Sequence, residues 1–167
     1  EKPEEKVYSA LGRFRELKEE KGTIIGVTGC VAQQEGKRLL KRVPYLDLVV
    51  GTHALSRLPE LVRQVVDSGQ RIYETDFDPE GGYLKTPLPR KHGTKVKSYV
   101  TIMQGCNRFC SYCIVPYVRG RERSRPSREI LEEIRQLADR GVKEVCLLGQ
   151  NVNAYGRDRA YISAPEF

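Results

Sequence analysis

Short β-branched or apolar runs alternate with amphipathic stretches along this chain, and that alternation limits its fold more than any other feature. We expect helices at 1–21, 33–42, 57–67 and 127–140, and strands at 23–28, 46–50, 98–102 and 142–148. A strand, a crossover helix and a second strand pack as one sheet with parallel strands. The sequence therefore predicts an α/β fold.

Residues 70–96 interrupt this alternation. They hold three prolines, the pair Gly81-Gly82 and several acids, with little periodicity, which is typical of a linker. We therefore predict a first domain at 1–69, a linker at 70–96 and a second domain at 97–167. The first helix has no strand before it, and the second domain offers a single crossover. We expect the first domain to be truncated at its start and the second at its end.

Basic side chains are concentrated in one stretch. The chain carries 29 Lys and Arg against 22 Asp and Glu, a net charge of +7. From Arg90 to Arg128, seven arginines and three lysines oppose the single acid Glu122, a net of +9. Such a stretch attracts nucleic acid through counterion release, or it is an ordinary solvated surface. No apolar run approaches the roughly 20 residues of a membrane-spanning helix, so we expect a cytoplasmic protein without a membrane partner.

Three of the five cysteines fall within eight residues, in the motif GCNRFCSYC at 105–113. The spacing C-x3-C-x2-C lets Cys106, Cys110 and Cys113 bind three irons of a [4Fe–4S] cube and leaves the fourth iron open. An open metal position is typical of reactive sites, whereas structural sites are closed by protein ligands. Zinc is the alternative, although it normally takes a fourth Cys or His, and neither His53 nor His92 belongs to a nearby paired motif.

This motif, with Tyr112 before its last cysteine and an expected strand before its first, resembles the radical S-adenosylmethionine (SAM) superfamily. The resemblance implies that Cys106, Cys110 and Cys113 are the cluster ligands and that Tyr112 lies beside the adenine of SAM. It implies that SAM binds the open iron and is cleaved by an electron from the cluster to a 5′-deoxyadenosyl radical. For the fold, it implies a (β/α) barrel of which 97–167 is the first part.

Two further stretches resemble the methylthiotransferases within that superfamily. One is IVPYVRG at 114–120 with SRP at 124–126, and the other is GCVAQ at 29–33. The resemblance implies that 1–69 belongs to the parallel α/β N-terminal methylthiotransferase domain. It also implies that Cys30 is one of three cysteines that hold a second, auxiliary [4Fe–4S] cluster, and the other two have no counterpart here. We expect the complete enzyme to use SAM and two clusters, and this chain alone not to complete methylthiolation.

The stretches GQNVNAYG at 149–156 and EKVYSALGR at 5–13 are similar to one branch of the methylthiotransferases. That branch acts on the isopentenylated adenosine next to the anticodon of tRNA and replaces an adenine C–H with a methylthio group. The implied partner is the tRNA anticodon loop, while the electron donor and the sulfur source stay unidentified. The alternatives are a sister methylthiotransferase acting on threonylcarbamoyladenosine tRNA or a ribosomal protein, and a non-catalytic, metal-containing RNA-binding module.

Four arginines alternate after the cysteine motif: Arg119, Arg121, Arg123 and Arg125. In an extended segment they would share one side, because successive side chains of a strand point in opposite directions. We expect them to contact RNA phosphate or the carboxylate of SAM, with a solvated surface as the alternative.

Gln150 and Asn151 follow an expected strand, and ligands collect at the carboxyl ends of strands in parallel sheets. We predict that both contact SAM, with a plain polar turn as the alternative. Cys146 lies inside an apolar run and is predicted to be a small buried hydrophobe rather than a ligand. His53 receives no role.

Overall fold

Strand β2 (Leu48–Val50) organises the first part of the chain, because all three of its residues are buried in the computed structural model. Strands β1 (Gly26–Thr28) and β3 (Ile72–Glu74) flank it, and both run parallel to it in the order β1-β2-β3. An entirely apolar strand suits this position, since helices cover both faces of a parallel sheet.

The structure describes residues 2–77 and 96–158, which divide into two compact units, one within 1–85 and one within 86–167. Each unit combines helices with a parallel strand pair, which confirms the predicted α/β class. Among the described residues, no helix has the length and apolar content needed to cross a membrane.

Three helices cover one face of the first sheet: α1 (Lys2–Lys21), α2 (Cys30–Glu35) and α3 (Lys37–Arg42). Their buried Leu11, Ala32 and Leu39 share one core with Val49 of β2. The single helix predicted at 33–42 is instead two helices, because the chain turns at Gly36. The φ of Gly36 is 51°, a left-handed conformation that strains any residue with a Cβ.

Helix α4 (Leu58–Ser68) covers the opposite face, after the short 3-10 helix η1 (Leu55–Arg57). Its buried Leu61 and Val65 share a second core with Leu48 and Val50. The side chains of β2 therefore alternate between the two cores, with Val49 on one side and its two neighbours on the other. Gly69, with a φ of 65°, ends α4.

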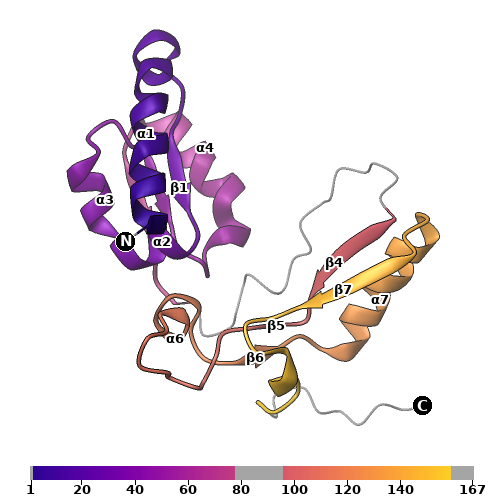
Figure 1. Cartoon of the computed structure of the whole chain (residues 1–167). Helices are drawn as coiled ribbons and strands as arrows, with labels where there is room; N and C mark the ends of the chain where they lie inside the picture. The colour runs from indigo at the N-terminus through magenta and orange to yellow at the C-terminus, as the bar shows by residue number, and fades with distance from the viewer. Residues whose placement is uncertain (1, 78–95, 159–167) are drawn as a thin grey trace. The chain divides into compact units, whose positions relative to one another are not determined.

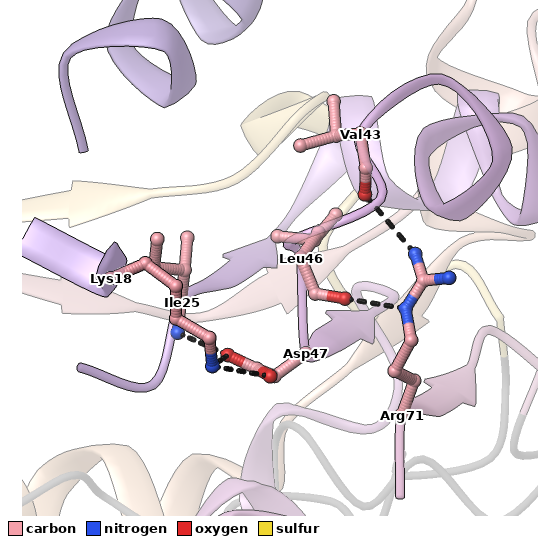
Figure 2. Close-up of polar contacts among 6 residues, drawn as sticks. All are labelled: Lys18, Ile25, Val43, Leu46, Asp47 and Arg71. Carbon is pink, nitrogen blue, oxygen red and sulfur yellow. Dashed lines mark hydrogen bonds and ion pairs between the residues drawn. The ribbon is translucent and has the colours of Figure 1, made fainter. Parts of the chain in front are cut away.

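Two polar anchors fix the amino end of this sheet (Figure 2). The Asp47 carboxylate accepts the backbone N–H of Ile25 at 2.8 Å and the Lys18 ammonium at 2.7 Å, so it ties α1 to the starts of β1 and β2. The Arg71 guanidinium donates to the carbonyl oxygen of Leu46 at 2.8 Å. These contacts satisfy backbone groups that the strand ladder leaves unpaired.

Strand β3 lies inside the stretch predicted to be a linker, so the first unit extends past the predicted end at residue 69. Ile72 packs against the core beneath α4, and Tyr73 packs against the core beneath α1 to α3. The strand escapes notice in the sequence because it is three residues long and precedes a stretch rich in prolines and glycines. Residues 78–95 of the predicted linker lie outside the described residues, and the domain boundaries there stay a prediction.

The second unit contains one strand–helix–strand crossover. Strands β4 (Lys97–Thr101) and β7 (Glu144–Leu148) pair in parallel, and helix α7 (Ser127–Asp139) lies between them in the chain (Figure 1). Buried Val100, Ile130 and Leu137 share one core. The remaining elements are the antiparallel pair β5 (Met103–Gln104) and β6 (Arg123–Ser124), helix α6 (Val115–Arg119) and the 3-10 helix η2 (Val152–Ala154).

Candidate functional site

The cysteine motif forms a loop between β5 and α6, and its base is closed by backbone contacts. The N–H of Cys106 donates to the carbonyl oxygen of Gly120 at 3.1 Å, which joins the start of the loop to the segment after α6. Gly105 has a φ of 79°, and a Cβ there would collide with the carbonyl of Arg121. A glycine is therefore required where the two segments cross.

The three thiols of this loop differ in exposure. Cys106 is buried, Cys113 is half-buried and Cys110 is exposed, and none of them forms a disulfide. The N–H of Cys113 donates to the carbonyl oxygen of Cys110 at 2.9 Å, which makes a tight turn between the last two cysteines. Within the described residues, no three His, Cys, Asp or Glu side chains are gathered closely enough to hold a metal ion.

The chemistry of this donor set fits three corners of a [4Fe–4S] cube, because such clusters are held by thiolates and the loop supplies three. The motif at 105–113 contains no histidine, so the loop itself offers no fourth ligand of that type.

Gln150 and Asn151 fasten this loop from the segment after β7. The side-chain oxygen of Gln150 accepts the N–H of Gly105 at 2.7 Å, immediately before the first cysteine. The side-chain amide of Asn151 donates to the Glu122 carboxylate at 2.9 Å, and the side-chain oxygen of Asn107 accepts the N–H of Glu122 at 3.1 Å. Asn107 and Glu122 could not be identified from the sequence, because neither their spacing nor their residue type marks them as partners.

Tyr112 projects into solvent, with 90% of its surface exposed. An exposed ring is available to stack on an adenine. Its contact with the adenine of SAM stays a prediction. The side chains of Gln150 and Asn151 are hydrogen-bonded within the protein, and their contacts with SAM also stay predictions.

The four alternating arginines do not share one side. Arg121 is exposed, Arg119 and Arg123 are half-buried, and Arg125 is only 7% exposed. Arg125 donates to the carbonyl oxygen of Thr101 at 2.7 Å and forms an ion pair with Glu133 of α7 at 2.7 Å. The segment is only partly extended, because α6 runs to Arg119 and Gly120 has a φ of 78°, while Arg123–Ser124 form the strand β6. Arg125 therefore stabilises the interior of the second unit and is not displayed for RNA.

Tyr155 closes the other side of this interior. Its hydroxyl donates to the carbonyl oxygen of Arg125 at 2.8 Å. Burial, with a smaller contribution from the negative charge of Asp158, raises the pKa of Tyr155 above its ordinary value near 10.0. The segment after η2 is thus tied to the stretch that follows the cysteine loop.

Cys30 lies in the first unit, at the first residue of α2 and directly after β1. It is half-buried and is the only cysteine between residues 1 and 85. The N–H of Gly29 donates to the carbonyl oxygen of Val50 at 3.1 Å, so the carboxyl ends of β1 and β2 meet beside it. This is the edge of a parallel sheet at which ligands collect.

Gln33 joins the loops at that edge. Its side-chain oxygen accepts the N–H of Thr52 at 3.0 Å, and its side-chain nitrogen donates to the carbonyl oxygen of Thr75 at 2.6 Å. A Cβ on Gly51 would collide with this side chain. One glutamine, a single helical turn after Cys30, therefore connects α2 to the ends of β2 and β3.

Two remaining candidates have ordinary surroundings. His53 is buried, and its ring packs edge-on against Phe77 at a centroid distance of 4.7 Å. Phe77 falls in the predicted linker, so this contact was not expected. Cys146, predicted to be a small buried hydrophobe, is half-buried on β7, a strand that is only partly covered.

Two protein families match the chain, one in each unit. Residues 1–51 match the uncharacterized protein family UPF0004, and residues 100–164 match the radical SAM superfamily. The second match includes all three cysteines of the loop.

Curated relatives match nearly the whole chain. The tRNA-2-methylthio-N(6)-dimethylallyladenosine synthase of Geobacter metallireducens is 59% identical over 93% of this chain and 35% of the relative. The enzymes of the same name from Syntrophus aciditrophicus and Pasteurella multocida are 53% and 49% identical, over 94% and 93% of this chain and 34% and 32% of each relative. The chain thus spans about a third of the length of these relatives. It belongs to the radical SAM methylthiotransferases, a family whose members use SAM and [4Fe–4S] clusters.

Proposed function

We propose that this chain is the cluster-binding part of an enzyme that inserts a methylthio group into isopentenylated adenosine next to the anticodon of tRNA. The observation that carries the proposal is the loop of three free cysteines in the unit that matches the radical SAM superfamily. The names of the relatives, which identify them as tRNA-2-methylthio-N(6)-dimethylallyladenosine synthases, support the choice of nucleoside.

Cys106, Cys110 and Cys113 are proposed to hold the cluster that binds SAM, and Cys30 to hold part of an auxiliary cluster. When bound, the first cluster supplies the electron that converts SAM to a 5′-deoxyadenosyl radical. A radical is needed because the adenine C–H is neither acidic nor electrophilic, so no general acid or base can break it. The role of the protein is to position the reacting groups and exclude water.

The loop contacts described above suit this positioning role. Gln150 holds the backbone N–H that precedes Cys106, so the buried thiol keeps its place while the exposed part of the loop closes. Tyr112 remains the proposed contact of the SAM adenine. Gln150 and Asn151 are proposed to orient the loop and to reach SAM only if their present hydrogen bonds are exchanged.

The substrate is proposed to enter as a single-stranded loop, whose bases can be splayed out and read on their faces and edges. Arg119, Arg121 and Arg123 are proposed to contact its phosphates, and Arg125 is left out because it is buried in an ion pair. The absence of a disulfide among the five cysteines, all of which lie in the described residues, fits a reducing compartment, and with tRNA as substrate we place the activity in the cytoplasm.

Anaerobic reconstitution of the chain with iron and sulfide tests this proposal. We expect a brown protein with about four irons and four sulfides bound at the loop. The Cys110→Ala variant should lose this cluster, whereas Cys146→Ala should keep it. Stoichiometric zinc without sulfide would contradict the proposal and favour a metal-containing RNA-binding module. Methylthiolation of a different nucleoside or of a ribosomal protein by the full-length protein would contradict the choice of substrate.

A further inference from the structure

Two aromatic rings stand exposed beside the cysteines, and neither is among the predicted contacts of the cluster or of SAM. Phe109 is 52% exposed and Tyr117 is 64% exposed. Their ring centroids are 6.2 Å apart, and their planes meet at 83°. Single exposed apolar side chains are ordinary, but a contacting pair of large rings, one on the loop and one on the helix that follows it, indicates a binding surface.

The backbone directs both rings outward. Tyr117 lies in α6 between Pro116 and Val118, which are both buried, so the residue between them faces away from the interior of the unit. Phe109 has a φ of 48°, a left-handed conformation that is strained for a bulky residue. Strain of this kind is concentrated at functional sites, where it is part of how a group is presented.

The stretch of chain that carries the two rings is basic. No acidic residue occurs from Gly105 to Arg121, while Arg108 and Arg121 are both exposed. The nearest acid in the chain, Glu122, accepts a hydrogen bond from the amide of Asn151. A surface with flat apolar rings and positive charge complements a chain of phosphates that carries flat bases.

We propose that Phe109 and Tyr117 form a corner on which an unpaired base of the RNA substrate stacks. This rests on the proposed function, which supplies RNA as the substrate, and it adds the residues that hold a base. Because the two rings are nearly perpendicular, a base lies flat on one ring and meets the other with its edge. Arg108 and Arg121 neutralise the neighbouring phosphates.

Binding of a fluorescent, single-stranded anticodon-loop RNA to the 167-residue chain tests this corner, with a matched RNA that carries abasic sites at its unpaired adenosines. Phe109→Leu and Tyr117→Leu keep apolar bulk but remove the aromatic face. Each should weaken binding of the intact RNA by about 5- to 20-fold, as expected for one stacked base. Binding of the abasic RNA should change less than twofold. Tyr99→Leu is the matched control, because Tyr99 is 51% exposed in the same unit but lies on β4.

Several outcomes overturn the corner. The proposal is wrong if both variants bind intact RNA with an affinity within twofold of the original chain. It is also wrong if the original chain binds intact and abasic RNA equally well. Unchanged RNA binding together with reduced self-association would assign the patch to a protein contact instead. Iron and sulfide are counted on the same samples, because failure of the proposed function appears there as a missing [4Fe–4S] cluster. If the chain binds intact RNA more tightly than abasic RNA but holds no cluster, the stacking proposal is supported and only the proposed chemistry is contradicted.

Discussion

The two units bury their parallel strands to very different degrees. In the first, β2 is enclosed on both faces by helices, and no residue of it is more than 2% exposed. In the second, Tyr99, Leu147 and Leu148 on the paired strands are 51%, 44% and 41% exposed. The first unit is therefore a closed scaffold, whereas the second is closed only on the face beneath α7.

The cysteines follow the same division. Cys30 begins a helix at a sheet edge that Gln33 holds together, so its surroundings are formed without a ligand. The cysteines of the second unit lie on a loop whose base is fixed and whose tip is exposed. The difference between the units is that side-chain hydrogen bonds join the loops around Cys30, whereas only the base of the second unit's cysteine loop is held.

The largest loss of stability is expected from breaking the buried ion pair between Arg125 and Glu133 in the second unit. Glu133→Leu removes the partner of Arg125 and leaves a buried guanidinium uncompensated. Losing one partner of a buried ion pair costs about 3 to 5 kcal/mol, so the free energy of unfolding of this unit should fall by that amount. Hydrogen exchange of peptides from α7 measures it. The double variant Arg125→Met, Glu133→Leu should recover most of the loss, and a single variant as stable as the original would show that the pair is not buried in solution.

A pair of leucine truncations compares the two sheets directly. Leu48→Ala on β2 opens a cavity in a closed core and should cost about 2 to 4 kcal/mol of unfolding free energy. Leu148→Ala on β7 removes a side chain that is already 41% exposed and should cost less than about 1 kcal/mol. Chemical denaturation, monitored by hydrogen exchange in each unit, measures both unfolding free energies. Equal losses would mean that β7 is covered in solution.

The glutamine at the edge of the first sheet should matter in two ways. Gln33→Leu removes hydrogen bonds to Thr52 and Thr75, which should lower the unfolding free energy of the first unit by about 1 to 3 kcal/mol. It should also speed alkylation of the Cys30 thiol, because the loops around it are no longer joined. Gln34→Leu is the matched control on the exposed side of α2. If both variants leave the alkylation rate unchanged, the edge is not preformed.

The smallest effect concerns pH. The pKa of Tyr155 is higher in the folded than in the unfolded chain, so the folded state keeps its phenol proton after the unfolded state has lost it. The resulting stability is complete below about pH 10 and is lost as the pH rises further. Tyr155→Phe should lose about 1 kcal/mol at pH 7, the value of its hydrogen bond, and should decline less steeply in alkali. Parallel decline of both proteins above about pH 9 would contradict the assignment of the pKa shift to burial of this hydroxyl.

Much of the fold was predictable because its strands and helices have clear periods. The apolar runs at 46–50 and 142–148 contain β2 and β7, and the helix predicted at 127–140 corresponds to α7. Strand β3 was not predictable, since three residues carry too little periodicity and their burial depends on β2 beside them. The break at Gly36 was missed for a related reason: a glycine in a helical pattern does not say whether the helix continues.

The site was predictable where residue type and spacing carry the chemistry, as in the three cysteines of the loop. It was not predictable where the contact is made by tertiary packing. Alternation placed Arg125 on a shared side with its neighbours, but the turn at Gly120 and the carboxylate of Glu133 direct it inward. The hydrogen bonds between Gln150 and Gly105 and between Gln33 and Thr52 join segments far apart in sequence, so no local sequence pattern predicts them.

Electron paramagnetic resonance of the reconstituted and reduced chain, recorded with and without SAM, tests the central claim most directly. The account predicts a [4Fe–4S] signal from the loop cysteines that changes when SAM is added, because one iron has no protein ligand. Cys110→Ala should abolish that signal. A signal that does not respond to SAM, or a reduced chain without any cubane signal, would contradict the account.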